Sequence, residues 1–213
     1  MKTEKLFVLL ILIILSTSCN VSSPSEDGTH DISYEGVTDA DFDVIPNEAT
    51  TFETNLYLVN FVDSRETKIR EAMEIVKLVI GTEEFKDRIL NHRYNGARTF
   101  VDNGGFTNAQ IYKKILDGAE RLQPARNNTM DAEIELYTAA TNVVGYTYPS
   151  SRRIWVNTKY FDVYTPAGVA HNLMHEWMHK LGFDHSQSWN SARDYSVPYA
   201  IGNIVGDIGR KFL

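Results

Sequence analysis

Residues 165–185, TPAGVAHNLMHEWMHKLGFDH, carry the strongest local structural signals of the chain. Thr165 followed by Pro166 is a typical helix start, because a hydroxyl can cap the first turn and proline is tolerated at the first helical position. Gly182 is a typical helix stop, because glycine readily adopts the positive φ that turns the chain out of a helix. Between these ends, apolar residues recur at every fourth position, which predicts a helix with one face in the core: Val169, Leu173, Trp177 and Leu181.

The same stretch carries three histidines and one acid at regular intervals. On a helix, residues four apart lie about 6 Å from each other on one face, so His175 and His179 can each give a ring nitrogen to one Zn²⁺. After the turn at Gly182, His185 can return as a third ligand and leave the fourth position to water, as catalytic zinc requires. Glu176 lies beside the metal and is placed to take a proton from that water. We therefore predict a zinc cofactor with three histidine ligands and a glutamate base.

The pattern H-E-x-x-H-x-x-G-x-x-H at residues 175–185 resembles the signature of the metzincin zinc metallopeptidases. The resemblance implies zinc ligation by His175, His179 and His185, with Glu176 as general base and acid. It also implies a twisted mixed sheet over the active-site helix, an edge strand that pairs with an extended substrate, and a small C-terminal subdomain ending in a helix. The likeness covers about residues 52–213, although only eleven of them are specific.

One feature of that family is absent: no methionine follows Met178, so the methionine turn expected under the zinc is missing. Residues 195–199 occupy its place. In some relatives a tyrosine just after that turn binds zinc or stabilises the oxyanion, and Tyr199 is the nearest candidate here. A packing role for Tyr199 is the alternative. An aspartate could also replace His185 as the third ligand, and the candidates are Asp184, Asp194 and Asp207.

The rest of the chain predicts the other layers of the fold. Strand patterns cover residues 55–62, 97–101, 132–139, 142–148 and 152–157, and helix patterns cover 65–80, 83–91, 108–122 and 199–212. Ser64 is the expected N-cap of the first helix, and Gly81 its end. This order indicates an α/β or α+β sandwich, and we predict α+β, of the zincin type.

The N-terminal sequence is typical of a targeting segment. Lys2 and Lys5 precede ten apolar residues, 6–15, which are too few to span a bilayer but fit a secretory signal. Residues 15–19, LSTSC, resemble a bacterial lipoprotein signal, which implies cleavage before Cys19 and lipidation of that residue. Ordinary cleavage at Ser18 with a free thiol is the alternative. We expect a signal peptide at 1–18 and an exported protein, anchored by lipid to a bacterial membrane and facing the periplasm or the cell surface.

Charge separates a second segment from the remainder. Residues 20–50 hold eight acids and no Lys or Arg, whereas residues 51–213 hold 19 acids and 19 bases. We expect 19–50 to be an acidic linker and 51–213 to be the zinc metallopeptidase domain. No basic stripe is present, so nucleic acid is not an expected partner.

These features predict a monomeric zinc-dependent endopeptidase that hydrolyses peptide bonds by metal-activated water, with a peptide or protein as substrate. The alternative is a non-catalytic, zinc-containing surface lipoprotein that binds a partner, which the missing methionine turn would favour.

Overall fold

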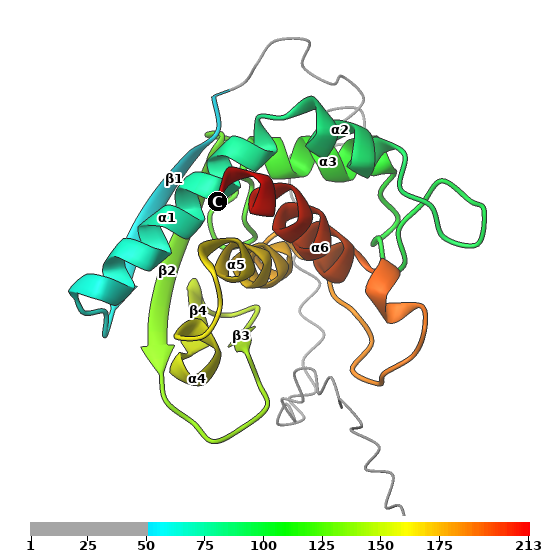
Figure 1. The fold of residues 1–213 in the computed structure, drawn as a ribbon. Helices are drawn as coiled ribbons and strands as arrows, with labels where there is room; N and C mark the ends of the chain where they lie inside the picture. Colours follow the sequence, from blue (N-terminus) through cyan, green and yellow to red (C-terminus); the bar gives the residue numbers. More distant parts are fainter. Residues whose placement is uncertain (1–50) are drawn as a thin grey trace, which may run out of the picture.

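Strand β2, Thr129–Tyr137, is the centre of the sheet, and its side chains alternate between a buried and a half-buried face. The computed structural model, which describes residues 51–213, shows a four-stranded sheet in the order β1-β2-β4-β3 (Figure 1). Strands β1, Glu53–Val59, and β4, Arg153–Asn157, both run parallel to β2. Strand β3, Gly145–Thr147, pairs antiparallel with β4 and forms one edge. The sheet is therefore mixed.

The described residues form six α-helices (Figure 1). They are α1 (Asp63–Ile80), α2 (Glu83–Leu90), α3 (Asn108–Asp117), α4 (Thr158–Phe161), α5 (Pro166–Lys180) and α6 (Val197–Gly209). Helix α5 contacts α1, α6, β3 and β4, so it lies at the centre of the molecule. Two short 3₁₀ turns, Arg193–Tyr195 and Arg210–Phe212, lie on either side of α6.

One hydrophobic core joins the helices to one face of the sheet. Many of its fully buried side chains come from α1, β2 and α5, and they include Ile69, Met73, Ile134, Leu173 and Trp177. Burying one such side chain contributes about 1.5–3 kcal/mol. The opposite face of the sheet carries polar and aromatic residues, which alternate with the buried ones along β2 and β4.

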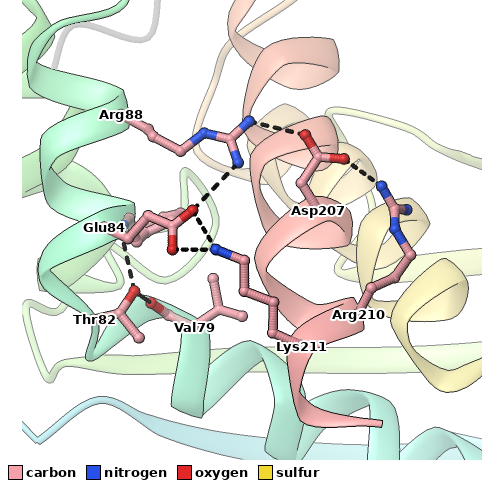
Figure 2. Close-up of polar contacts among 8 residues, drawn as sticks. Val79, Thr82, Glu84, Arg88, Asp207, Arg210 and Lys211 are labelled. Atoms are coloured by element: carbon pink, nitrogen blue, oxygen red, sulfur yellow. Dashed lines mark hydrogen bonds and ion pairs between the residues drawn. The ribbon is translucent and has the colours of Figure 1, made fainter.

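Ion pairs connect the C-terminal segment to α2 (Figure 2). Arg88 lies 2.9 Å from Asp207 of α6, and Lys211 lies 2.6 Å from Glu84. Arg210 also pairs with Asp207. Exposed pairs of this kind contribute at most about 1 kcal/mol each, so their main effect here is to orient α6 against α2.

The α+β class and the C-terminal helix are confirmed, and most predicted elements exist with shifted ends. The predicted strand 142–148 is reduced to three residues, Gly145–Thr147. The last helix begins at Val197, two residues early, because Pro198 is accommodated in its first turn. The predicted cap Ser64 is wrong: α1 begins at Asp63, and its N-cap position is Val62, without a side-chain hydrogen bond.

Two further predictions are wrong for local reasons. Residues 97–101 form no strand, only isolated bridges from Ala97 to Tyr94 and from Val101 to Ser196. Helix α3 ends at Asp117 instead of continuing to residue 122, because Gly118 adopts a left-handed conformation with φ 64°. A Cβ at Gly118 would lie 2.2 Å from the Thr129 carbonyl oxygen, so only glycine fits this close approach of α3 to β2. Helix α4 was not predicted.

Several sequence predictions lie outside the described residues. They are the signal peptide at 1–18, the lipidation of Cys19 and the acidic linker at 19–50, and all of them stay predictions, as does the domain boundary at residue 51. Among the helices formed by residues 51–213, none combines the length and apolar character needed to cross a membrane.

Candidate metal centre

Helix α5 has the ends that its sequence predicts. The Thr165 hydroxyl accepts a hydrogen bond from the Gly168 amide, and Pro166 occupies the first turn. The helix stops at Lys180, and Gly182 adopts φ 93°, which redirects the chain. The turn brings the segment that follows α5 back alongside the helix.

This turn brings the three predicted histidines together. One ring nitrogen from each of His175, His179 and His185 lies within 4.8 Å of the other two. The Nε2 atoms of His175 and His185 are 3.2 Å apart. Three nitrogens bound to one tetrahedral zinc ion at 2.0–2.1 Å would be separated by about 3.3 Å. The cluster can therefore hold one metal ion after only small side-chain adjustments.

Backbone carbonyls orient two of the three rings. His179 Nδ1 lies 2.8 Å from the Phe183 carbonyl oxygen, and His185 Nδ1 lies 3.1 Å from the Ser186 carbonyl oxygen. Because a carbonyl only accepts, each Nδ1 is the donor and each neutral ring keeps its lone pair on Nε2. His179 Nδ1 is also 3.4 Å from an Asp184 carboxylate oxygen. Outer contacts of this kind fix ring orientation in metal sites.

Burial keeps two of the rings neutral. It lowers the pKa of His175 well below its ordinary value, and the nearby His179 lowers it further when protonated. Burial likewise lowers the pKa of His185 to about 4. For His179, burial is outweighed by the hydrogen bond with Asp184 and the charge of Glu176, so its pKa is raised. Neutral imidazole is the form that binds metal, so His175 and His185 are prepared for a cation, whereas His179 would release its proton when an ion binds.

Glu176 lies beside this cluster and lines the same cleft. Its side chain is almost completely buried, and its Oε1 atom has no hydrogen-bond partner among the described residues. Burial raises the pKa of Glu176 to about 7, against the opposing effects of His179, Lys180 and a hydrogen bond from Asn172. A carboxyl group with a pKa near neutrality can both accept and donate a proton at that pH.

The cleft above the histidines has a volume of about 390 Å³. Its floor is formed by His175, Glu176, His179 and His185, and its rim by β3 and the residues that follow it. Figure 1 shows β3 next to α5. A Cβ at Gly145 would lie 2.8 Å from the Asn172 side chain, so glycine lets the edge strand approach α5 closely.

Tyr199 lies in the first turn of α6 and contacts the cluster. Its ring centroid is 4.4 Å from that of His175 and 4.7 Å from that of His185. The Arg193 guanidinium lies 4.8 Å from the Tyr199 ring centroid. The structure therefore places Tyr199 at the site, while its predicted catalytic role remains untested.

The alternative aspartate ligands lie in different places. Asp207 pairs with Arg88 and Arg210 on α6, and Asp194 is exposed. Asp184 follows the turn and contacts His179, so it supports a ligand candidate instead of replacing His185. Among the described residues, only the three histidines form a cluster suited to a metal ion.

The sequence did not single out several residues in and around the cleft. Asn172 lies one helical turn before Glu176 and hydrogen-bonds to it. Arg193 lies in the turn before α6 and contacts the Tyr199 ring. Neither residue belongs to a recognisable motif. The cleft residues of β3 and its turn depend on sheet order, which no local pattern reveals: Gly145, Tyr146, Thr147, Tyr148 and Pro149.

Comparison with protein-family models and with curated proteins finds no match to this chain. The function of the protein is therefore inferred from the motif at residues 175–185 and from the geometry of the histidine cluster.

Proposed function

We propose that the protein is a zinc-dependent endopeptidase of the metzincin type. The observation that carries this proposal is the cluster of His175, His179 and His185 at the floor of a cleft that also contains Glu176. The three imidazoles fit a zinc ion in donor type and number. When bound, the ion would act as a Lewis acid, making water acidic enough to ionise near neutral pH and polarising a substrate carbonyl.

Glu176 would act first as general base and then as general acid. Its partnerless Oε1 accepts a proton from the attacking water, and the protonated carboxyl then donates that proton to the leaving amine. Tyr199, beside His175 and His185, would stabilise the oxyanion of the tetrahedral intermediate.

An extended peptide would bind along β3. This strand lies at the edge of the sheet and lines the cleft, so its outer backbone groups face the space beside the histidines. Adding a strand to a sheet edge is a common way to hold a peptide in an extended form. The antiparallel edge on a parallel sheet also agrees with the layout that the metzincin resemblance implies.

The cellular setting follows from the N-terminal sequence alone. We propose that the chain is exported, that residues 1–18 are removed and that a lipid on Cys19 anchors the catalytic domain to a bacterial membrane through the acidic linker. In this setting the substrate would be an exported or extracellular peptide or protein, and the enzyme would act as a monomer.

The test uses the full-length protein with a denatured protein as substrate. We expect proteolysis that a chelator abolishes and added zinc restores. Replacing Glu176 by glutamine should reduce the rate by at least about a hundredfold while the zinc content stays the same. Glu120→Gln is the matched control, because Glu120 is also buried against α5 but does not line the cleft, and its rate should match the wild type.

Two outcomes would overturn the proposal. Undiminished proteolysis by Glu176→Gln would remove the role of the base. A zinc-loaded wild type that cleaves no substrate would instead favour the zinc-containing binding lipoprotein.

A further inference from the structure

An aromatic cluster lies on the outer face of the sheet beside the cleft. We call it the aromatic shelf, and its members are Tyr137, Tyr146, Tyr148 and Trp155. The rings of Tyr146 and Trp155 are stacked, with centroids 5.1 Å apart and an angle of 9° between planes. Tyr148 contacts both edge-on at 5.6 Å, and Tyr137 contacts Tyr146 at 5.3 Å.

The sheet register explains why these rings share one face. Tyr146 is paired with Trp155 across β3 and β4, and directly paired residues point to the same side. Their neighbours Ile154 and Val156 are buried on the helix-covered side, so Trp155 must point away from it. The shelf therefore lies outside the core, and Tyr148 is 38% exposed.

The shelf continues into the cleft. Tyr146 and Tyr148 belong to the aromatic shelf, and both also line the 390 Å³ cleft above the histidines. Arg153, the nearest charged neighbour on β4, is paired with Glu133 and Glu135, so its charge is neutralised locally. A ligand along β3 thus meets aromatic surface on the outer side of the strand.

Contacts to helix α5 hold the shelf in position. The Lys180 ammonium group donates hydrogen bonds to the carbonyl oxygens of Tyr148 and Ser151, in the turn after β3. The Thr147 hydroxyl donates to the Arg153 carbonyl oxygen at 2.7 Å, which fastens the strand to β4. Lys180 directly follows His179, so the shelf is fixed relative to the candidate metal site.

We propose that the aromatic shelf is a specificity site that selects large aromatic or apolar side chains at alternate positions of an extended peptide bound along β3. The proposal rests on the proposed peptidase function and adds a substrate class to it. In a strand added to β3, the residue opposite Tyr146 places its side chain on the same face, with a Cβ separation of about 4.5–5.5 Å. The residue two positions away points to that face as well, toward Tyr148.

The chemistry of the shelf favours one kind of side chain. Stacked and edge-on rings present broad apolar faces, and a further aromatic ring gains from contact with them beyond simple burial. An acidic side chain would lose water there without finding a free cation, because Arg153 is already paired with Glu133 and Glu135. The selected substrate therefore has aromatic or large apolar residues spaced two apart on one side of the scissile bond.

The experiment is cleavage of a randomised peptide library by the zinc-loaded full-length protein, followed by kinetics on two peptides. One peptide carries aromatic residues at the two selected positions, and the other carries serine there. We expect the cleaved peptides to show a preference for aromatic or large apolar side chains at two positions that are separated by one residue. For Tyr146→Thr, kcat/KM on the aromatic peptide should fall about threefold to tenfold, with little change on the serine peptide.

The sheet offers a matched control. Tyr57 lies on the same outer face at the opposite edge of the sheet, where it is 66% exposed and paired with Glu133 in the β1–β2 register. Threonine is a good strand residue, so both substitutions should preserve the fold. Tyr57→Thr should therefore leave kcat/KM for both peptides unchanged. Zinc content and thermal unfolding, measured for every variant, separate a lost contact from a lost fold.

The outcomes separate this inference from the proposed function. Cleavage without a preference at alternate positions would overturn the inference alone, and so would an equal loss on both peptides in Tyr146→Thr. If Tyr146→Thr fails to fold, the side-chain preference of the wild type in the peptide library still tests the inference. No cleavage of any peptide would overturn the proposed function and the shelf together.

Discussion

Two buried carboxyl groups, one on helix α5 and one packed against it, have different surroundings. Glu176 lies on the histidine side and lines a cleft of about 390 Å³. Glu120 lies on the Trp177 side, next to a hollow of only about 10 Å³. Glu120 accepts hydrogen bonds from the Trp177 indole at 2.8 Å and from the Asp131 amide at 3.0 Å. Burial raises the pKa of both groups to about 7.

The difference shows that a raised pKa reports burial and does not by itself identify a catalytic acid. Glu120 has two donors on one oxygen and no space for a substrate, so its chemistry is confined to holding Trp177 and the start of β2 together. Glu176 has the same pKa shift but opens onto three imidazoles and a cleft. The histidine side of α5 is therefore suited to chemistry, and the Trp177 side is suited to stability.

The largest expected effect is the loss of zinc affinity when a histidine of the cluster is removed. Replacing His179 by alanine should weaken zinc binding by more than the 10–100-fold typical of changes in outer contacts, because one of three ligands is lost. His171→Ala is the matched control, since His171 lies on the same helix but packs against Gly206, outside the cluster. Zinc affinity is measured by competition with a chromophoric chelator. Equal losses in the two variants would mean that the cluster is not the metal site.

The next largest effect is the loss of stability when Trp177 is removed. Trp177 is fully buried, and its ring meets that of Phe52 edge-on at 5.9 Å. Trp177→Ala should lower the free energy of unfolding by about 3–5 kcal/mol, because it leaves a cavity and removes a donor from Glu120. Urea denaturation of the metal-free protein measures the loss. The fraction that stays folded should still bind zinc, and a variant with wild-type stability would contradict the assignment.

The smallest expected effect is the pH dependence of stability that Glu120 causes. Below its ordinary pKa of 4.5, Glu120 is protonated in both the folded and unfolded states. Between that value and about 7 the folded state holds the extra proton, so stability falls as pH rises. Glu120→Gln keeps the acceptor and removes the titration. Relative to this variant, the wild type should lose at most about 3 kcal/mol between pH 4 and pH 8, as followed by urea unfolding.

A pH-independent difference between these two proteins would show that Glu120 does not titrate in that range. In that event the similarity between the two buried carboxyl groups would be only apparent.

Helix α5 was predictable because its signals are local. Thr165, Pro166 and Gly182 define the ends of α5 within a few residues, and helical spacing places His175 and His179 on one face. His185 required only the turn that Gly182 provides. The three predicted ligand candidates therefore meet as expected, although metal binding itself stays a prediction.

Non-local contacts explain what could not be predicted. Residues 97–101 have the composition of a strand but find only single bridges, because no neighbouring strand lies beside them. Gly118 ends α3 early because β2 passes within contact distance. The sheet order, the aromatic shelf and the pairing of Glu120 with Trp177 all join segments far apart in the chain. No periodicity within a single segment encodes such pairings.

The anchoring of α5 has one further consequence. Its core-facing side, with Leu173 and Trp177 fully buried, is secured by packing and by the hydrogen bond from the Trp177 indole to Glu120. Small zinc domains collapse when the ion is withdrawn, since the ion supplies their folding energy. In the proposed zinc peptidase, the fold would therefore persist without zinc, and activity would return once the ion was bound again. Supply of the metal would then act as a reversible control that leaves the architecture untouched.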